Sequence, residues 1–283
     1  MRLVRFEREG SACLGVLEDS EVVELAPERG WPTDMIELIA RGEEAKAPIE
    51  EETASAPRHS LSEVRLLAPL RPRKNVFAVG RNYLEHVTEV REVRPVPEHP
   101  VIFSKPPTAV IGPGEAIELA NDPTGSTDYE GELAVVIGRP CHRIDPAEAI
   151  DHIFGYTIVN DVSSRRLQKR HSQWLIGKGA DTFCPLGPAI VTAEEIEDVG
   201  SLYIRTRVNG ELRQEAPVSE MIFDIPTIIA TLCSVMTLEP GDVITTGTPG
   251  GVGLGFDPPR YLQPGDVVEV SIDRVGTLTN PVT

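Results

Sequence analysis

Short apolar runs, separated by turns that contain glycine or proline, dominate the chain and predict a protein built mainly of β-strands. Near the start, the alternating stretches RLVRF and CLGVLE predict two strands, and EVVELA predicts a third. The dipeptide Asn209-Gly210 predicts a hairpin turn because both residues tolerate positive φ. Beyond residue 70, strands are predicted in eight segments: NVFAVG, PVIFSK, ELAVVIG, GYTIVND, PAIVTAEE, LYIRTRVNGEL, DVITTG and DVVEVSID.

Helices are predicted singly among these strands. Thr33 can cap a short helix over residues 34–41, and Ser163 or Ser164 can cap a polar helix over 165–175. Asp224 can cap a third helix over 225–236. In that helix one face is predicted to hold five apolar residues: Ile225, Ile228, Ile229, Leu232 and Val235.

Residues 42–60 are charged, contain two prolines and lack an apolar period, so a solvated linker is predicted there. We therefore expect a small β-rich N-terminal domain over residues 1–70 and a larger domain over residues 71–283. Strands with single helices between them favour a strand-dominated, mixed α+β fold, with a mixed sheet or barrel instead of a doubly wound sheet.

Charge and cysteine content exclude several classes of protein. The 283 residues include 27 Lys+Arg against 44 Asp+Glu, a net charge of −17 that disfavours binding to nucleic acid or to an anionic membrane surface. No apolar run approaches the roughly 20 residues of a membrane span, and the first residues lack the apolar core of a secretory signal. The four cysteines are widely separated, which predicts buried thiols in a cytoplasmic protein.

Carboxylates at the ends of two predicted strands are the first candidate for chemistry. Glu130 and Glu132 project from the same side of a strand, about 7 Å apart, and repel each other unless a cation or proton lies between them. Asp161 ends the strand GYTIVND and can supply a third oxygen ligand for Mg²⁺. The alternatives are a solvated strand face for the glutamates and a helix cap for Asp161.

Three further segments carry reactive groups. His86 and Glu89 are neighbours on a helix and form either a general base with its orienting carboxylate or a surface pair. Lys178 lies between two glycines in an apolar stretch, where it can supply positive charge to a substrate oxyanion. The loop TTGTPGGVGLG can hold a carboxylate through its N–H groups and threonine hydroxyls. It lacks the glycine spacing of nucleotide-binding loops.

These segments resemble the fumarylacetoacetate hydrolase family. The resemblance runs from about residue 75 to the C-terminus and rests on GRNYLEHVTEV, DYEGELAVVIG, the series Asp161, Gln168 and Lys178, and TTGTPGGVG. It implies a mixed β-roll catalytic domain, a homodimer, and Mg²⁺ or Mn²⁺ bound by Glu130, Glu132 and Asp161.

The resemblance also implies roles for the other candidates. His86 and Glu89 correspond to the family's water-activating dyad, and Lys178 to its catalytic lysine. The expected substrate contacts are Arg81, Gln168, Gly247 and Thr248. The chain departs from the family at Arg166, where an acid is common, and at Gly179, where serine often follows the lysine.

The expected reaction is hydrolysis of a C–C bond in a 2,4-dioxo acid such as an acylpyruvate, with the metal stabilising the enolate that leaves. The alternative is decarboxylation or isomerisation of oxaloacetate, or of a 2-hydroxyhepta-2,4-diene-1,7-dioate-type dicarboxylate, at the same metal site. A basic residue for a second carboxylate would favour the alternative, and four are candidates: Lys105, Arg165, Arg166 and Lys169. A binding protein without activity is a third hypothesis. The expected partner is a small anionic oxo acid, with no nucleic acid and no membrane.

Overall fold

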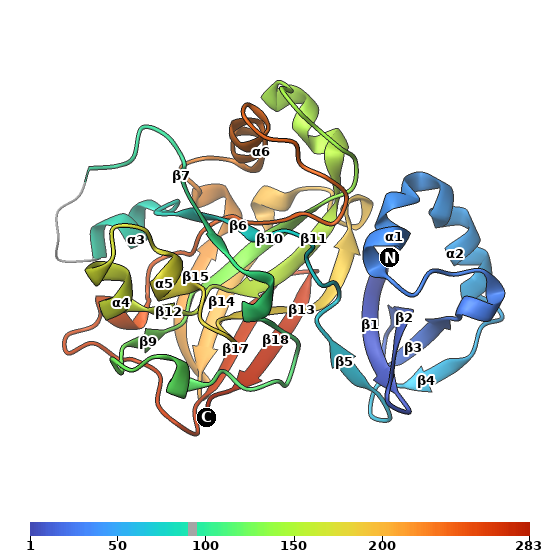
Figure 1. Ribbon diagram of the computed structural model, residues 1–283, viewed down its shortest axis with the longest axis horizontal. Helices are drawn as coiled ribbons and strands as arrows, with labels where there is room; N and C mark the ends of the chain where they lie inside the picture. Colours follow the sequence, from blue (N-terminus) through green and yellow to red (C-terminus); the bar gives the residue numbers. More distant parts are fainter. Residues whose placement is uncertain (90–94) are drawn as a thin grey trace.

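A sheet of twelve strands crosses the computed structural model, which describes residues 1–89 and 95–283, with residues 87–89 described by their backbone only (Figure 1). The N-terminal strands join the rest where β1 pairs antiparallel with β13, with Leu3 opposite Ile190. In the order of the chain, the strands of this sheet are β1 (Arg2–Arg8), β2 (Ser11–Glu18), β3 (Glu21–Leu25), β4 (Arg58–Ser60), β5 (Arg65–Leu67), β6 (Val76–Gly80), β7 (Val101–Lys105), β8 (Val110–Ile111), β10 (Gly131–Ile137), β11 (Ile153–Asn160), β13 (Cys184–Thr192) and β16 (Val243–Thr245).

A second, four-stranded sheet packs on the C-terminal part of the long sheet. Its strands lie in the order β15, β14, β17 and β18, and their bounds are β14 (Tyr203–Val208), β15 (Glu211–Pro217), β17 (Val267–Ile272) and β18 (Gly276–Pro281). Leu133 and Val135 of β10 share one apolar core with Ile204 and Val270 of this sheet. A short ladder joins β9 (Thr127–Asp128) to β12 (Ser163–Ser164).

Parallel and antiparallel pairs occur together in the long sheet. β16 runs parallel to β6, whereas it runs antiparallel to β10. The predicted Asn209-Gly210 turn joins β14 to β15, with φ of 52° and 80° at its two residues. The mixed, strand-dominated fold is therefore confirmed.

The helices are short (Figure 1), and those of the N-terminal part share a core with side chains of β1, β2 and β3. The α-helices are α1 (Met35–Ala40), α2 (Lys46–Thr53), α3 (Leu84–Glu89), α4 (Arg165–Arg170), α5 (Leu175–Lys178) and α6 (Ile225–Cys233). The 3₁₀ helices are η1 (Pro27–Arg29), η2 (Gly42–Ala45), η3 (Pro107–Ala109), η4 (Leu119–Asn121), η5 (Pro146–His152), η6 (Ala193–Glu195), η7 (Val199–Ser201), η8 (Val218–Glu220) and η9 (Gly253–Gly255). None of the described helices has the length and apolar character that crossing a bilayer requires.

Two predictions for the N-terminal part, one of a helix cap and one of a linker, are wrong. Asp34, not Thr33, caps α1, because the Asp34 carboxylate accepts a hydrogen bond from the Ile36 N–H at 2.9 Å. Residues 42–60 form η2, α2 and β4 instead of a linker. Ile49, which is 3% exposed, fixes α2 to the core, and a single buried residue of this kind produces no apolar period.

The predicted polar helix over residues 165–175 is divided. α4 ends before His171, and α5 folds back so closely that a side chain at Gly177 would meet the Gln168 N–H group at 2.5 Å. Glycine at this position therefore allows α5 to bring Lys178 beside the first turn of α4.

α6 begins where the sequence predicts but is shorter. The Asp224 carboxylate accepts a hydrogen bond from the Thr227 N–H at 2.9 Å, and Ile228, Ile229 and Leu232 are buried. Val235 is 76% exposed, contrary to the prediction, because the helix ends at Cys233.

We predict that Asp224→Ala lowers the free energy of unfolding by about 1 kcal/mol, because the substitution removes the helix cap. This loss corresponds to a fall of about 2–4 °C in the thermal midpoint. Val235→Ala is the matched control and should leave the midpoint unchanged in a calorimetric scan. Equal shifts in the two variants would contradict this account of α6.

Candidate active site

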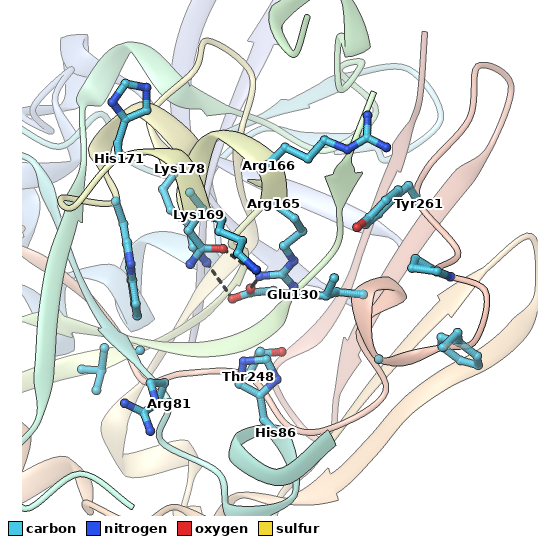
Figure 2. Close-up of a pocket in the computed structure, with 18 of the residues that line it drawn as sticks. Arg81, His86, Glu130, Arg165, Arg166, Lys169, His171, Lys178, Thr248 and Tyr261 are labelled. Carbon is cyan, nitrogen blue, oxygen red and sulfur yellow. Dashed lines mark hydrogen bonds and ion pairs between the residues drawn. The ribbon is translucent and has the colours of Figure 1, made fainter. Parts of the chain in front are cut away.

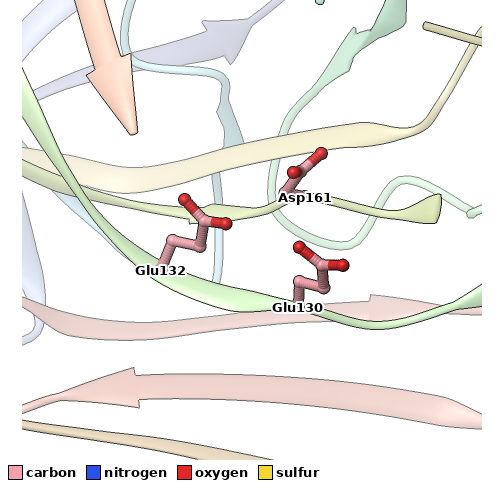
Figure 3. A group of neighbouring side chains, drawn as sticks. All are labelled: Glu130, Glu132 and Asp161. Carbon is pink, nitrogen blue, oxygen red and sulfur yellow. The ribbon is translucent and has the colours of Figure 1, made fainter. Parts of the chain in front are cut away.

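Three buried carboxylates meet where β10 and β11 lie side by side (Figure 3). Gly131 pairs with Asn160, so Glu130 and Glu132 on either side of Gly131 face Asp161, which follows Asn160. The Asp161 N–H donates to the Glu130 carbonyl at 2.8 Å, which fixes this crossing. One oxygen from each carboxylate lies within 4.8 Å of the others, and the three residues are at most 4% exposed.

Buried cations compensate two of these carboxylates. Lys178 Nζ lies 2.8 Å from Glu130 Oε2 and 2.6 Å from Asp161 Oδ2. Lys105 Nζ lies 2.5 Å from Asp161 Oδ1, and Arg165 forms a further ion pair with Glu130. Because each of these cations is itself almost fully buried, removing one would leave an uncompensated charge in the interior.

Glu132 has no ion pair with a described residue. Its Oε2 accepts a hydrogen bond from the Gly247 N–H at 2.8 Å. Burial raises the pKa of Glu132 well above its usual range, and the nearby Asp161 and Glu130 carboxylates raise it further. Burial also favours the neutral form of Glu130, but the two cations paired with that residue hold its pKa below the usual range.

The donor set fits a hard divalent cation. The three side chains offer only carboxylate oxygens, the ligands that Mg²⁺ and Mn²⁺ prefer. Glu132, whose charge the described residues leave uncompensated, would gain most from such an ion. The buried acidic cluster could therefore bind a divalent metal.

A pocket of about 590 Å³ opens above the cluster (Figure 2). Glu130 reaches its wall, whereas Glu132 and Asp161 lie outside its lining. Five cationic side chains and two acidic ones line the pocket: Arg81, Arg165, Arg166, Lys169 and Lys178, with Glu130 and Asp257. In a chain with a net charge of −17, this excess of positive charge favours an anionic ligand.

Most of the predicted site residues lie on this pocket. Arg81, His86, Gln168, Lys178 and Thr248 all line it. The Thr248 hydroxyl donates to the Gly131 carbonyl at 3.0 Å and accepts from Gln214 at 2.8 Å.

Gly247 lies behind the wall, where its N–H group contacts Glu132. Its φ of 97° places it in the left-handed region, and a side chain there would meet Asn82 at 2.7 Å. Gly247 therefore contacts a carboxylate of the cluster instead of lining the pocket.

The segment that carries His86 is fixed by one buried amide. Asn82 donates to the carbonyls of Phe223 at 2.9 Å and Thr246 at 2.8 Å, and accepts from the Phe223 N–H at 2.8 Å. Arg81, just before it, adopts a positive φ of 59° and donates to the Pro95 carbonyl. The side chain of Glu89, the predicted partner of His86, lies outside the described residues.

Arg165 and Asp128 are more central than the sequence suggests. Arg165 Nε donates to Asp128 Oδ2 at 2.8 Å, while the buried Nη2 has no hydrogen-bond partner among the described residues. Asp128 also accepts from the N–H groups of Gly253 and Leu254 at 2.7 and 2.9 Å. Asp128 therefore joins Arg165 to the loop on the opposite wall. The alternation of Asp128 with the two glutamates is the one signal of this role in the sequence.

Lys105 has a different environment from the other candidates for a second carboxylate. Arg165, Arg166 and Lys169 line the pocket, whereas Lys105 lies beneath it and donates to Asp161 and to the Val162 carbonyl, at 3.0 Å for the latter. Lys105 is fully buried in the described structure. The structure therefore assigns Lys105 to the charge balance of the cluster.

Comparison with known proteins agrees with this geometry. The family model described as fumarylacetoacetate (FAA) hydrolase C-terminal matches residues 75–283, and the Rv2993c-like N-terminal model matches residues 1–69. The chain belongs to the fumarylacetoacetate hydrolase family.

Two curated relatives are named as enzymes. Oxaloacetate tautomerase YisK of Bacillus subtilis is 48% identical over 89% of this chain and 87% of its own length. The mitochondrial oxaloacetate tautomerase fahd2 of Xenopus laevis is 40% identical over 100% of this chain and 90% of its own length.

Solved structures of family members share the whole fold. A fumarylacetoacetate hydrolase from Exiguobacterium antarcticum superposes with a TM-score of 0.89 at 44% identity, covering 100% of this chain and 99% of that one. A maleylpyruvate hydrolase from a Sphingobium species, in complex with manganese(II) and pyruvate, gives a TM-score of 0.84 at 32% identity with the same coverage. A family member of this shape therefore holds the type of ion that the acidic cluster fits.

We predict that Glu132→Gln weakens Mn²⁺ binding at least about tenfold, because it removes a ligand charge. It should not lower the thermal midpoint of the metal-free protein, since no described cation depends on Glu132. Calorimetric titration with MnCl₂ measures the first effect. Glu197→Gln, at an exposed position outside the site, is the matched control. Unchanged Mn²⁺ affinity in Glu132→Gln would exclude this residue as a ligand.

Proposed function

We propose that this protein is a divalent-metal-dependent enzyme that interconverts the enol and keto forms of oxaloacetate. The observation that carries the proposal is a cationic pocket above a buried cluster of three carboxylates. A cation in the cluster and cations on the wall suit a small substrate with an oxo acid at one end and a second carboxylate at the other.

The residues that line the pocket favour this reaction over C–C hydrolysis, which is the reaction expected from the sequence. Arg165, Arg166 and Lys169, three of the four candidates for a second carboxylate, line the pocket. The relatives at 48% and 40% identity are named oxaloacetate tautomerases, whereas the maleylpyruvate hydrolase is 32% identical. Both facts support a dicarboxylate and a proton transfer.

The reaction needs one proton removed from the enol oxygen and one added to carbon 3. A divalent cation held by Glu130, Glu132 and Asp161 would supply positive charge to the oxygens of the oxo acid group. In our proposal the positive charge of Lys178 Nζ stabilises the negative charge that develops on the enol oxygen. In ketonisation the enol proton is released to solvent and His86 donates a proton to carbon 3, and in enolisation His86 removes that proton again. Arg166 binds the distal carboxylate.

Hydrolysis of an acylpyruvate is the second candidate function. A volume of about 590 Å³ is generous for a four-carbon acid and leaves room for a longer acyl group. His86 on the pocket wall is also suited to activating water. The choice of Mg²⁺ or Mn²⁺, the homodimer and the cytoplasmic location remain predictions.

The test compares three substrates with Mg²⁺ or Mn²⁺ present. We expect fast conversion of enol-oxaloacetate to the keto form, followed by its enol absorbance and by coupling to malate dehydrogenase, with no pyruvate released. Pyruvate from acetylpyruvate or maleylpyruvate, without faster ketonisation, would support the hydrolase instead. Pyruvate from oxaloacetate would identify a decarboxylase.

We further predict that His86→Ala lowers kcat for ketonisation by about 10²–10⁴-fold, the range typical of a general base. Mn²⁺ affinity should stay unchanged, because His86 is not among the cluster ligands. His142→Ala, at an exposed position that does not line the pocket, should keep full activity. Full activity in His86→Ala would show that this residue has no part in the mechanism, but it would not contradict the proposed metal site.

A further inference from the structure

Two buried cysteines far from the pocket lie in direct contact. Cys141 follows β10, and Cys233 is the last residue of α6, which is labelled near the top of Figure 1. Their Sγ atoms are 2.7 Å apart, although 92 positions separate the two residues in the chain. Cys141 is 4% exposed and Cys233 is 0% exposed.

Backbone hydrogen bonds hold the two sulfur atoms together. Cys141 and Leu238 exchange N–H···O bonds of 3.1 and 3.0 Å, and the Arg143 N–H donates to the Cys233 carbonyl at 2.7 Å. These three bonds join the turn after β10 to the end of α6 on both sides of the thiols. The backbone segments that carry the two thiols are therefore fixed to each other.

The other two cysteines lack such a partner. Cys13 is half-buried in β2, and its Sγ lies 3.8 Å from the Ser11 carbonyl. Cys184 is buried in β13 and belongs to a different core cluster from Cys141 and Cys233. Among the described thiols, only Cys141 and Cys233 have their sulfur atoms in contact.

We propose that Cys141 and Cys233 form an intrachain disulfide when a peroxide reaches the protein, and that this bond locks the end of α6 to the turn after β10. The Cys141 thiolate attacks one peroxide oxygen, which gives a sulfenic acid and hydroxide. The Cys233 sulfur then displaces the sulfenic oxygen as water, forming the S–S bond. The two sulfur atoms lose two electrons, hydrogen peroxide gains them, and the thiol protons end in two molecules of water.

This cross-link forms slowly. Burial, followed by the adjacent Cys233 thiol, raises the pKa of Cys141 to about 12, so the thiolate is scarce at neutral pH. The pair therefore forms a stabilising cross-link under sustained oxidation and does not respond to a brief exposure to peroxide. Once formed, the bond closes a long loop in the unfolded chain, which raises the stability of the folded state.

The test uses a Cys13→Ser/Cys184→Ser background, so that only the pair remains. After prolonged treatment with hydrogen peroxide, peptide mapping of the unreduced protein should find the peptide with Cys141 linked to the peptide with Cys233. The thermal midpoint should rise by about 5–10 °C relative to the reduced protein. Adding Cys141→Ser to this background removes the linked peptide and the rise.

The same mapping on the unsubstituted chain guards against a variant that fails to fold. There the linked peptide should again contain Cys141 and Cys233. Two results would overturn the proposal: both thiols remaining titratable under conditions that oxidise Cys13, or cross-links that form only between Cys13 residues of two chains.

Discussion

The buried charge where β10 and β11 meet is the constraint on which the rest of the site depends. Asp128, Glu130, Glu132 and Asp161 bring four carboxylates into the interior, and Lys105, Arg165 and Lys178 bring three cations. Isolated charges in a low-dielectric interior are too costly to persist, so each must be paired, neutralised by a proton or bound to a metal. Among the described residues, these three cations form ion pairs with Asp128, Glu130 and Asp161, and Glu132 is the carboxylate without an ion pair.

The same requirement explains how distant parts of the chain come together. Lys105 arrives on β7, Arg165 on the first turn of α4, and Lys178 at the end of α5. Asp128 extends the network to the loop at Gly253, on the other side of the pocket. Residues that line the pocket, such as Arg165 and Lys178, are thus held in place by ion pairs with the buried carboxylates. A substitution among those carboxylates is therefore expected to displace the residues that contact the substrate.

Much of the fold and of the cluster could be predicted because the signals are local. Alternation along one strand places Glu130 and Glu132 on one side, and an Asp at the end of a neighbouring strand completes the set. The hydrogen bond that caps α6 at Asp224 and the hairpin turn at Asn209-Gly210 each involve residues at most a few positions apart in the chain. The small N-terminal strands follow from short apolar runs in the same way.

What could not be predicted depends on contacts between remote segments. No sequence motif marks Lys105. Its pairing with Asp161 and the Val162 carbonyl depends on contacts between segments that are remote in the chain. The break after α4 depends on the close approach of Gly177 to Gln168, and α2 depends on one buried residue, Ile49. The contact between the two sulfur atoms of Cys141 and Cys233 arises in the same way, across 92 positions.

A crystal structure of the protein grown with Mn²⁺, with data collected near the manganese absorption edge, tests the central claim most directly. Our account predicts one anomalous-difference peak within bonding distance of Glu130, Glu132 and Asp161, with a carboxylate oxygen of Glu132 coordinated to the ion. A peak elsewhere, or none while Lys178 and Lys105 alone bridge the carboxylates, would contradict it, because the buried charge would then be balanced without a metal.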